Sequence, residues 1–536
     1  MGIPYYFSHL IKNHNKIIKN INHINSYNNL YLDSNSIIYD SIDFSNFKNN
    51  NQFENFIIQS VINKLENIIK IINPTNLIYI TFDGVPPISK LKQQKNRRYK
   101  SWHQNNILNK TTIWDTASIT PGTQFMKLLN NKITNHFNKI ITNCKIILNL
   151  SDKPGEGEHK IFQYIRDNNI NKYHNNIIYG MDADLIMLSL NHLKYCNSIY
   201  LYRETPIFIQ SLDSSLSPDK TYLIHINELS NEIYKLLSHD NIDNNNIDII
   251  DNIDNIDKDI YHNKIEDYIF ICFLLGNDFM PHFPAINIRI NGFTLLLELY
   301  KSLFNNNKYL TKNGKIIWSN FKLFIKKLAD NEYNSLLEIY SIRNKLSKKF
   351  YPETNDEEKE RKFIALPSWE RNIENFINPH EEDWEFRYYY SLFDINIDED
   401  KNAISNICMN YLQTLQWTYY YYSTECVNWS HSYNYDYPPL LVDLYKHIPY
   451  FDSELILKQD KQIIHEYVLL SYVLSRNSLS LLPIKIHNYL LENYESYYKT
   501  DYEVSYSFCK YFWEGHVKFP ELNFNDFEKN ILKLIK

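Results

Sequence analysis

Three short apolar runs, each closely followed by aspartate, most constrain the fold of this chain. The runs are NLYLD (29–33), NLIYITFDG (76–84) and NNIIYGMDAD (175–184), which are rich in Ile, Leu and Tyr. Continuous apolar runs of this length are typical of strands buried on both faces of a parallel sheet. Residues 53–72, between the first two runs, have the apolar spacing of a helix. The pattern predicts an α/β fold with a largely parallel central sheet flanked by helices.

Acidic side chains follow the predicted strands. Ligands of open α/β sheets bind at the carboxyl ends of the strands, so aspartates placed there are expected to meet at one edge. The glycine turn PGEGEHK, just before a predicted helix, adds two glutamates, and FLLGNDF adds an aspartate after a helix expected to end at Gly276. The candidate catalytic and metal-binding set is Asp33, Asp83, Glu156, Glu158, Asp182, Asp184 and Asp278.

Carboxylates gathered in this way require cations. Seven of them at one edge would repel each other, and some would stay protonated unless positive charge neutralised them. Oxygen ligands without histidine or thiolate suit Mg²⁺ or Mn²⁺, and paired ions about 4 Å apart are a common device for phosphodiester hydrolysis. The sequence therefore predicts a centre for two Mg²⁺ ions, in which Mn²⁺ can substitute. Taken singly, each aspartate also fits a turn or a helix cap, and the glutamate pair also fits the N-terminal end of a helix dipole.

A basic segment follows Asp83 directly, in GVPPISKLKQQKNRRYK (84–100). If it is helical from Ser89, four polar side chains share one face, because they are spaced i, i+4, i+7 and i+8. Arginine grips phosphate oxygens in a bidentate manner. An isolated run of this kind would be interpreted as a solvated helix face, but its position beside the acidic residues favours a pocket for a terminal phosphate. The candidate phosphate-binding residues are Lys90, Gln94, Arg97 and Arg98.

Composition excludes several classes of protein. The 536 residues are 44% hydrophobic, which suffices for a large core, and the apolar runs are much shorter than the roughly 20 residues of a membrane span. The net charge of −6 gives no global attraction to nucleic acid, so binding must rely on local basic patches. The six cysteines form no C-x-x-C pair. Since the start lacks the regions of a signal peptide, we expect an intracellular protein, cytoplasmic rather than nuclear, with no membrane partner.

The chain divides into two expected regions. Residues 1–345 are expected to form a nuclease domain that carries a low-complexity Asn/Ile/Asp insertion at 240–259. That insertion has no glycine and no closing glutamate for a calcium loop, so we interpret it as a surface segment. A polar linker at 346–366 leads to a mainly helical, aromatic-rich region at 367–536, expected to close the active-site pocket. Some tyrosines of the tract 417–437 are expected to stack on bases, and the others to fill the core.

With these residues assembled, the chain resembles the 5′-to-3′ exoribonuclease (Xrn/Rat-type) family. The resemblance covers its catalytic core without the long C-terminal extension of cytoplasmic relatives. The motifs that carry it are MGIPYYF, LYLDSNSII, FDGVPPISKLKQQKNRR, ITPGTQFM, PGEGEHKI, YGMDADLIML, FLLGNDFMPHFP, WTYYYYSTECVNWSHSYNYDYPPL and FWEGHVKFP. The resemblance implies a PIN/5′-nuclease-like core, two Mg²⁺ ions held by the seven carboxylates, and a 5′-monophosphate of RNA held by the basic residues. It also implies base stacking by Tyr39, Trp429 and His431.

Three positions depart from the family pattern. Ser36 occupies a usual glycine, Tyr39 replaces a histidine that stacks on the terminal base, and His431 replaces a tryptophan. The implied activity is processive 5′-to-3′ hydrolysis of single-stranded RNA with a 5′ monophosphate to mononucleotides, by a monomer. Two alternatives stay open, a 5′ or flap-type DNA nuclease and a catalytically silent RNA-binding scaffold. The scaffold is disfavoured, because a binder has no reason to keep so many carboxylates near a phosphate backbone.

Overall fold

The computed structural model describes residues 3, 5–21, 26–110, 113–168, 170–171, 173–196, 198–206, 209–238, 257–304 and 308–535. The insertion predicted at 240–259 lies outside the described residues, except for its last three. Among the helices of the described ranges, none is both long and apolar enough to cross a membrane.

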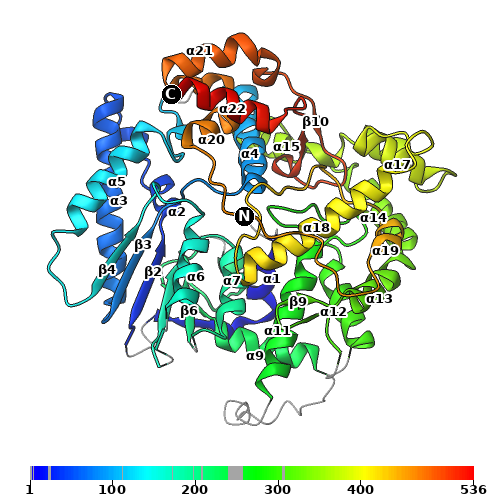
Figure 1. The fold of residues 1–536 in the computed structure, drawn as a ribbon, viewed down its shortest axis with the longest axis horizontal. Coiled ribbons are helices and arrows are strands. Elements are labelled where there is room, and N and C mark those ends of the chain that lie inside the picture. Colours follow the sequence, from blue (N-terminus) through cyan, green and yellow to red (C-terminus); the bar gives the residue numbers. More distant parts are fainter. Residues whose placement is uncertain are drawn as a thin grey trace.

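A seven-stranded sheet forms the centre of the first region (Figure 1). Its strand order is β1-β7-β6-β5-β2-β3-β4. The five strands β6, β5, β2, β3 and β4 run parallel to one another. At the other end of the sheet, β7 runs antiparallel to β6, and β1 runs antiparallel to β7. The bounds are β1 Ile18–Asn20, β2 Asn29–Asp33, β3 Leu77–Thr81, β4 Lys145–Asn149, β5 Asn176–Tyr179, β6 Ile199–Tyr202 and β7 Tyr222–His225. Two short hairpins lie elsewhere, β8 Thr311–Lys312 with β9 Lys315–Ile316, and β10 Val504–Ser505 with β11 His516–Val517.

The three strands predicted from apolar runs are β2, β3 and β5, and they are neighbours. Leu32 of β2 pairs with Ile80 of β3 on one side and with Tyr179 of β5 on the other, in parallel register. Their carboxyl ends therefore lie side by side. The predicted α/β fold with a largely parallel central sheet is confirmed.

Helices cover both faces of this sheet, because alternate residues of each strand point to opposite sides. Leu30 and Leu32 pack in one buried cluster with α3 and α5, whereas Tyr31 belongs to the cluster that contains α6 and α7. The helix α3 begins after Asn49, whose side chain accepts a hydrogen bond from the amide of Gln52. The bounds are α3 Asn50–Ile72, α5 Gln124–Phe137, α6 Gly157–Asp167 and α7 Asp184–His192.

The second half of the chain is mainly helical and packs against the first. The helix α18, drawn in yellow in Figure 1, lies against α7, and α4 lies against α20. The other helices are α1 Tyr6–Asn13, α2 Asn35–Tyr39, α4 Ile88–Ile107, α8 Ile209–Leu212, α9 Ile226–Leu237, α11 Lys258–Cys272, α12 Gly292–Leu303, α13 Trp318–Ala329, α14 Glu332–Leu346, α15 Asp356–Ile364, α16 Asn372–Ile377, α17 Trp384–Phe393, α18 Ala403–Ser423, α19 Leu441–His447, α20 Glu466–Val473, α21 Ile484–Asn493 and α22 Phe524–Ile535.

One buried hydrophobic cluster joins the two regions. It extends from Ile3 to Phe508 and includes side chains of α6, α11 and α18. The stretch predicted as a polar linker contains α15, a helix with no buried residue. The second region therefore shares its core with the nuclease region, and the domain bounds stay a prediction.

Candidate active site

The carboxyl edge of the sheet gathers the predicted carboxylates. Oxygens of Asp33, Asp83 and Glu158 lie within 4.8 Å of one another. The charges of Asp83, Asp182 and Glu156 act on Asp33, and those of Asp278 and Asp182 act on Asp184. All seven predicted acids thus form one electrostatic cluster, which we call the carboxylate cluster: Asp33, Asp83, Glu156, Glu158, Asp182, Asp184 and Asp278.

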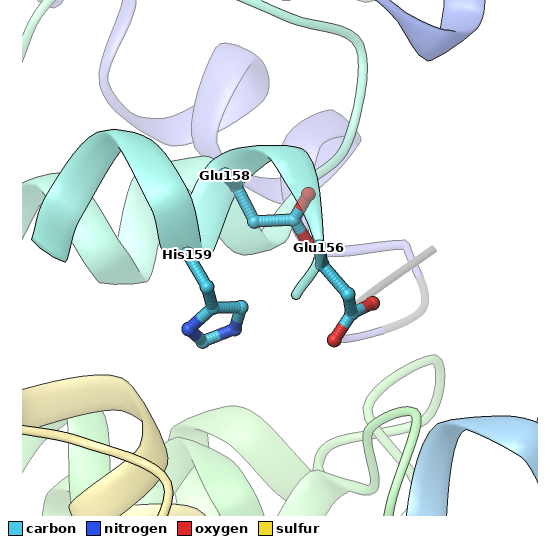
Figure 2. A group of neighbouring side chains, drawn as sticks. All are labelled: Glu156, Glu158 and His159. Atoms are coloured by element: carbon cyan, nitrogen blue, oxygen red, sulfur yellow. The ribbon is translucent and has the colours of Figure 1, made fainter. Parts of the chain in front are cut away.

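The glycine turn brings the two glutamates to this edge. The amide of Gly157 donates a hydrogen bond to Oδ1 of Asp83 at 2.6 Å. A Cβ atom on Gly157 would lie 2.3 Å from Oδ1 of Asp33, so a larger residue there would displace that carboxylate. Figure 2 shows Glu158 and His159 on the first turn of α6, with Glu156 just before it. The glycine is needed because α6 approaches the end of β2 closely.

Burial and mutual repulsion disfavour the charged forms of five of these acids, since the pKa is raised for Asp33, Asp83, Glu156, Glu158 and Asp184. Burial, with the charges of Asp83 and Asp182, raises the pKa of Asp33 well above its usual value. Burial and Asp278 raise the pKa of Asp184 to about 7. Oδ1 of Asp33 and Oδ1 of Asp184 are buried and have no hydrogen-bond partner among the described residues. Unpaired carboxylate oxygens that repel one another fit hard divalent cations, which prefer oxygen ligands.

Lys90 lies inside the carboxylate cluster. Its Nζ is 2.7 Å from Oδ2 of Asp278 and 2.5 Å from Oε2 of Glu156. Burial lowers the pKa of Lys90, but the nearby carboxylates, of which Asp278 and Glu156 act most strongly, outweigh this effect and raise it well above its usual value. In return, burial raises the pKa of Asp278, but nearby cations, of which Lys90 acts most strongly, lower it overall. The amine predicted to bind phosphate therefore also neutralises part of the acidic charge.

The other predicted phosphate ligands lie further along α4, which begins at Ile88 and confirms the predicted basic helix. Arg97 is exposed, and Nη2 of Arg98 donates a hydrogen bond to Oγ1 of Thr120 at 2.6 Å. Oε1 of Gln94 and Nε of Arg98 are buried without a hydrogen-bond partner in the described ranges. These atoms are available for a polar ligand beside the carboxylate cluster.

The three predicted stacking residues differ in exposure. Tyr39, at the end of α2, is 43% exposed, whereas Trp429 is 7% exposed. Nζ of Lys461 lies 4.6 Å from the ring centroid of Trp429. His431 is half-buried, with Nε2 at 2.9 Å from Oγ1 of Thr414. Of these three rings, that of Tyr39 is the most accessible to a base.

Two residues of the site were missed by sequence reasoning. The hydroxyl of Tyr421, on α18, donates a hydrogen bond to Oε1 of Glu156 at 2.8 Å. The Tyr421 ring stacks on Trp417 at 4.8 Å and on His159 at 3.7 Å between centroids. A ring nitrogen of His159 lies within 4.8 Å of the carboxylates of Glu156 and Glu158. The sequence offered two signals for these residues. His159 directly follows Glu158, and the two α18 rings are spaced i, i+4.

Comparison with known proteins gives two family matches. The family model described as the XRN 5′-3′ exonuclease N-terminus matches residues 1–205, and the model described as the Xrn1 helical domain matches residues 258–374 and 355–534. Together they cover nearly the whole chain, including every member of the carboxylate cluster.

Three relatives illustrate the similarity. The chain is 26% identical over 608 residues to 5′-3′ exoribonuclease 1 of Homo sapiens, covering 100% of this chain and 34% of the relative. It is 25% identical over 626 residues to 5′-3′ exoribonuclease 2 of Arabidopsis thaliana, with coverages of 92% and 61%. For 5′-3′ exoribonuclease 1 of Saccharomyces cerevisiae the identity is 24% over 586 residues, with coverages of 83% and 37%. The chain thus spans between 34% and 61% of the length of these relatives.

The family matches agree with the geometry of the site and with the order of the sequence motifs. The first matched segment supplies six of the seven carboxylates and the basic helix, and the second supplies Asp278 and the tyrosine that holds Glu156. On these grounds the chain belongs to the XRN 5′-3′ exonuclease family.

Proposed function

We propose that this chain is a metal-dependent 5′-to-3′ exoribonuclease that degrades single-stranded RNA with a 5′ monophosphate to mononucleotides, processively and as a monomer. The observation that carries the proposal is the convergence of acids from residues 33 to 278 beside the basic helix α4. The names of these three relatives, all 5′-3′ exoribonucleases, support the same reaction.

The carboxylate cluster would hold two Mg²⁺ ions, with Mn²⁺ as a substitute. The fit rests on the donor set, which is dominated by carboxylate oxygens, and on the unpaired Oδ1 atoms of Asp33 and Asp184. When bound, such ions stabilise negative charge on the reacting phosphate and activate water. The hydroxyl of Tyr421 fixes the orientation of Glu156, and Asn35 donates a hydrogen bond from Nδ2 to Oδ2 of Asp83 at 2.5 Å.

The basic face of α4 would bind the RNA end. Gln94, Arg97 and Arg98 offer donors to the oxygens of a terminal phosphate, and Lys90 adds positive charge where α4 meets the carboxylate cluster. A site that closes around a bare monophosphate excludes a cap by its size. Tyr39 would stack on a terminal base, since its ring is exposed at the end of α2.

A decay assay with defined RNA ends tests this proposal. One RNA sequence would be prepared with a 5′ monophosphate, a 5′ hydroxyl or a cap, and the matching DNA with a 5′ monophosphate. We expect rapid Mg²⁺-dependent release of mononucleotides from the monophosphorylated RNA, and much slower decay of the other substrates. A chelator should stop the reaction, and added Mn²⁺ should restore it.

Other outcomes would contradict the proposal in distinct ways. Faster decay of DNA than of RNA would favour the flap-type nuclease. RNA binding with no decay at any metal concentration would favour the silent scaffold. Decay that persists in excess chelator would remove the metals from the reaction.

A further inference from the structure

A cavity of about 640 Å³ adjoins the carboxylate cluster. Its walls are one face of α4, the loop after α11 and the segment 510–516, and its size is that of a site for a drug-sized ligand. Asp278 of the carboxylate cluster and Arg97 of the basic face both line it. Lys90, Gln94 and Arg98 are not among the described residues that line it. This cavity, called the α4 cavity below, therefore opens on the site but differs from the predicted 5′-phosphate pocket.

The lining of the α4 cavity is positively charged, although the whole chain carries a net charge of −6. The carboxylates that line it are Asp278, Asp436 and Glu514, of which Asp278 pairs with Lys90 and Glu514 pairs with Arg289. Nζ of Lys100 donates hydrogen bonds to the uncharged carbonyl groups of Trp513 and Gly515 at 2.5 and 2.7 Å. The cationic lining residues are Lys92, Arg97, Lys100, Arg289 and Lys510. Such a lining attracts an anion.

Polar atoms without partners point to a ligand in this cavity. Oε1 of Gln93, Nδ2 of Asn277 and Nε2 of His282 are buried and lack a hydrogen-bond partner among the described residues, and all three residues line the cavity. Buried polar atoms in native proteins are rarely left unpaired. The lining also offers an aromatic platform, because Trp513 is 45% exposed and stacks on Tyr511 at 4.5 Å between centroids.

We propose that the α4 cavity binds the released product, a nucleoside 5′-monophosphate. This inference rests on the proposed function, which liberates such nucleotides beside Asp278. The cations suit the phosphate, Trp513 suits the base, and the unpaired atoms suit the polar edges of the nucleotide. Of the four predicted phosphate-binding residues, only Arg97 also lines the cavity, so the product can leave the carboxylate cluster while Lys90, Gln94 and Arg98 hold the RNA end.

Calorimetric titration with adenosine 5′-monophosphate tests binding directly. The whole chain would be titrated in the presence of a chelator, so that metals at the carboxylate cluster do not contribute. Loss of one base-stacking contact is expected to weaken binding by about 5- to 100-fold in Trp513→Ala. Trp513→Phe should retain most of the affinity, and adenosine, which lacks the phosphate, should bind more weakly than the nucleotide.

The test has a second variant and a clear negative result. Lys510 is exposed, so Lys510→Gln is expected to fold normally. This substitution should weaken the binding of adenosine 5′-monophosphate more than it weakens the binding of adenosine. Equal nucleotide affinity in the wild type, Trp513→Ala and Lys510→Gln would overturn the proposal.

Inhibition kinetics distinguish the free product from the RNA end as the occupant. A product that binds in the α4 cavity should slow RNA decay by lowering kcat, with little change in KM for RNA, and Trp513→Ala should relieve this inhibition. If the cavity instead held the 5′ end of the RNA, the nucleotide would compete with RNA and Trp513→Ala would raise KM, which would overturn the assignment. A wild-type chain that hydrolyses no RNA would refute the proposed function. Calorimetry would still show whether the α4 cavity binds a nucleoside 5′-monophosphate.

Discussion

Replacing Asp182 with alanine is expected to slow RNA hydrolysis by about a hundred- to a thousandfold while RNA binding persists. Asp182 is only half-buried, so the substitution leaves the core intact, yet its charge raises the pKa of both Asp33 and Asp184. The loss of this proposed metal ligand is expected to remove several kcal/mol of charge stabilisation, at about 1.4 kcal/mol per tenfold in rate. Binding is expected to survive, since removing an acid weakens no contact to phosphate.

Single-turnover decay and fluorescence anisotropy, measured on the same RNA, separate the two effects. The matched control is Asp152→Ala, an exposed aspartate four residues before Glu156, which should retain the wild-type rate. An Asp182→Ala variant as active as the wild type would show that Asp182 has no role in catalysis. Loss of RNA binding together with activity would indicate a structural role instead.

The double substitution of Arg97 and Arg98 by alanine is expected to erase the preference for a 5′ monophosphate over a 5′ hydroxyl. A hydrogen bond to a charged group contributes about 1.5–3 kcal/mol, which is about ten- to a hundredfold in rate, so the loss of two such bonds should remove a preference of about a hundred- to ten-thousandfold. Decay of the hydroxyl-ended RNA should change little, because it lacks the phosphate that these arginines are proposed to bind. The measurement is the ratio of kcat/KM for the two RNA ends.

The control for this double variant is Lys132→Ala, an exposed cation on α5, which should leave the ratio unchanged. Because Arg98 donates a hydrogen bond to Thr120, the melting temperature of the double variant should be measured first. If that variant unfolds, Arg97→Ala alone carries the test, since Arg97 is exposed. A variant that keeps the full monophosphate preference would refute the phosphate pocket.

The strands could be predicted from the sequence because their signal is local. The bounds of β2 match the predicted run at both ends, and β3 and β5 lie within theirs. Parallel strands buried on both faces require uninterrupted apolar runs. The aspartates directly after these runs could be placed at one edge of the sheet, because the carboxyl ends of parallel strands lie side by side. This part of the site depended on secondary structure alone.

The position of Lys90 could not be predicted in the same way. Helical spacing predicts that Lys90 shares a face with the other candidate phosphate-binding residues. In the structure its amine pairs with Asp278, which is 188 residues away in the sequence. The hydrogen bond from Tyr421 to Glu156 spans 265 residues. Contacts of this kind depend on tertiary packing, which no local pattern specifies.

The helix α15 was missed although its signal was local. The side chain of Asn355 accepts a hydrogen bond from the amide of Glu358, and the Glu358 carboxylate accepts one from the amide of Thr354. An N-cap residue followed three positions later by glutamate is a recognised helix start. The high polarity of this stretch favoured a linker, because a helix that buries no side chain lacks an apolar stripe.

The central claim is that seven carboxylates distant in the sequence hold paired divalent cations next to α4. Anomalous diffraction from a crystal grown with Mn²⁺ tests it most directly, because the signal locates each ion. We expect two ions in the wild type, each bound by oxygens of the carboxylate cluster, and the loss of at least one of them in Asp182→Ala. Mn²⁺ bound elsewhere, in a crystal of protein that degrades RNA with Mn²⁺, would contradict it.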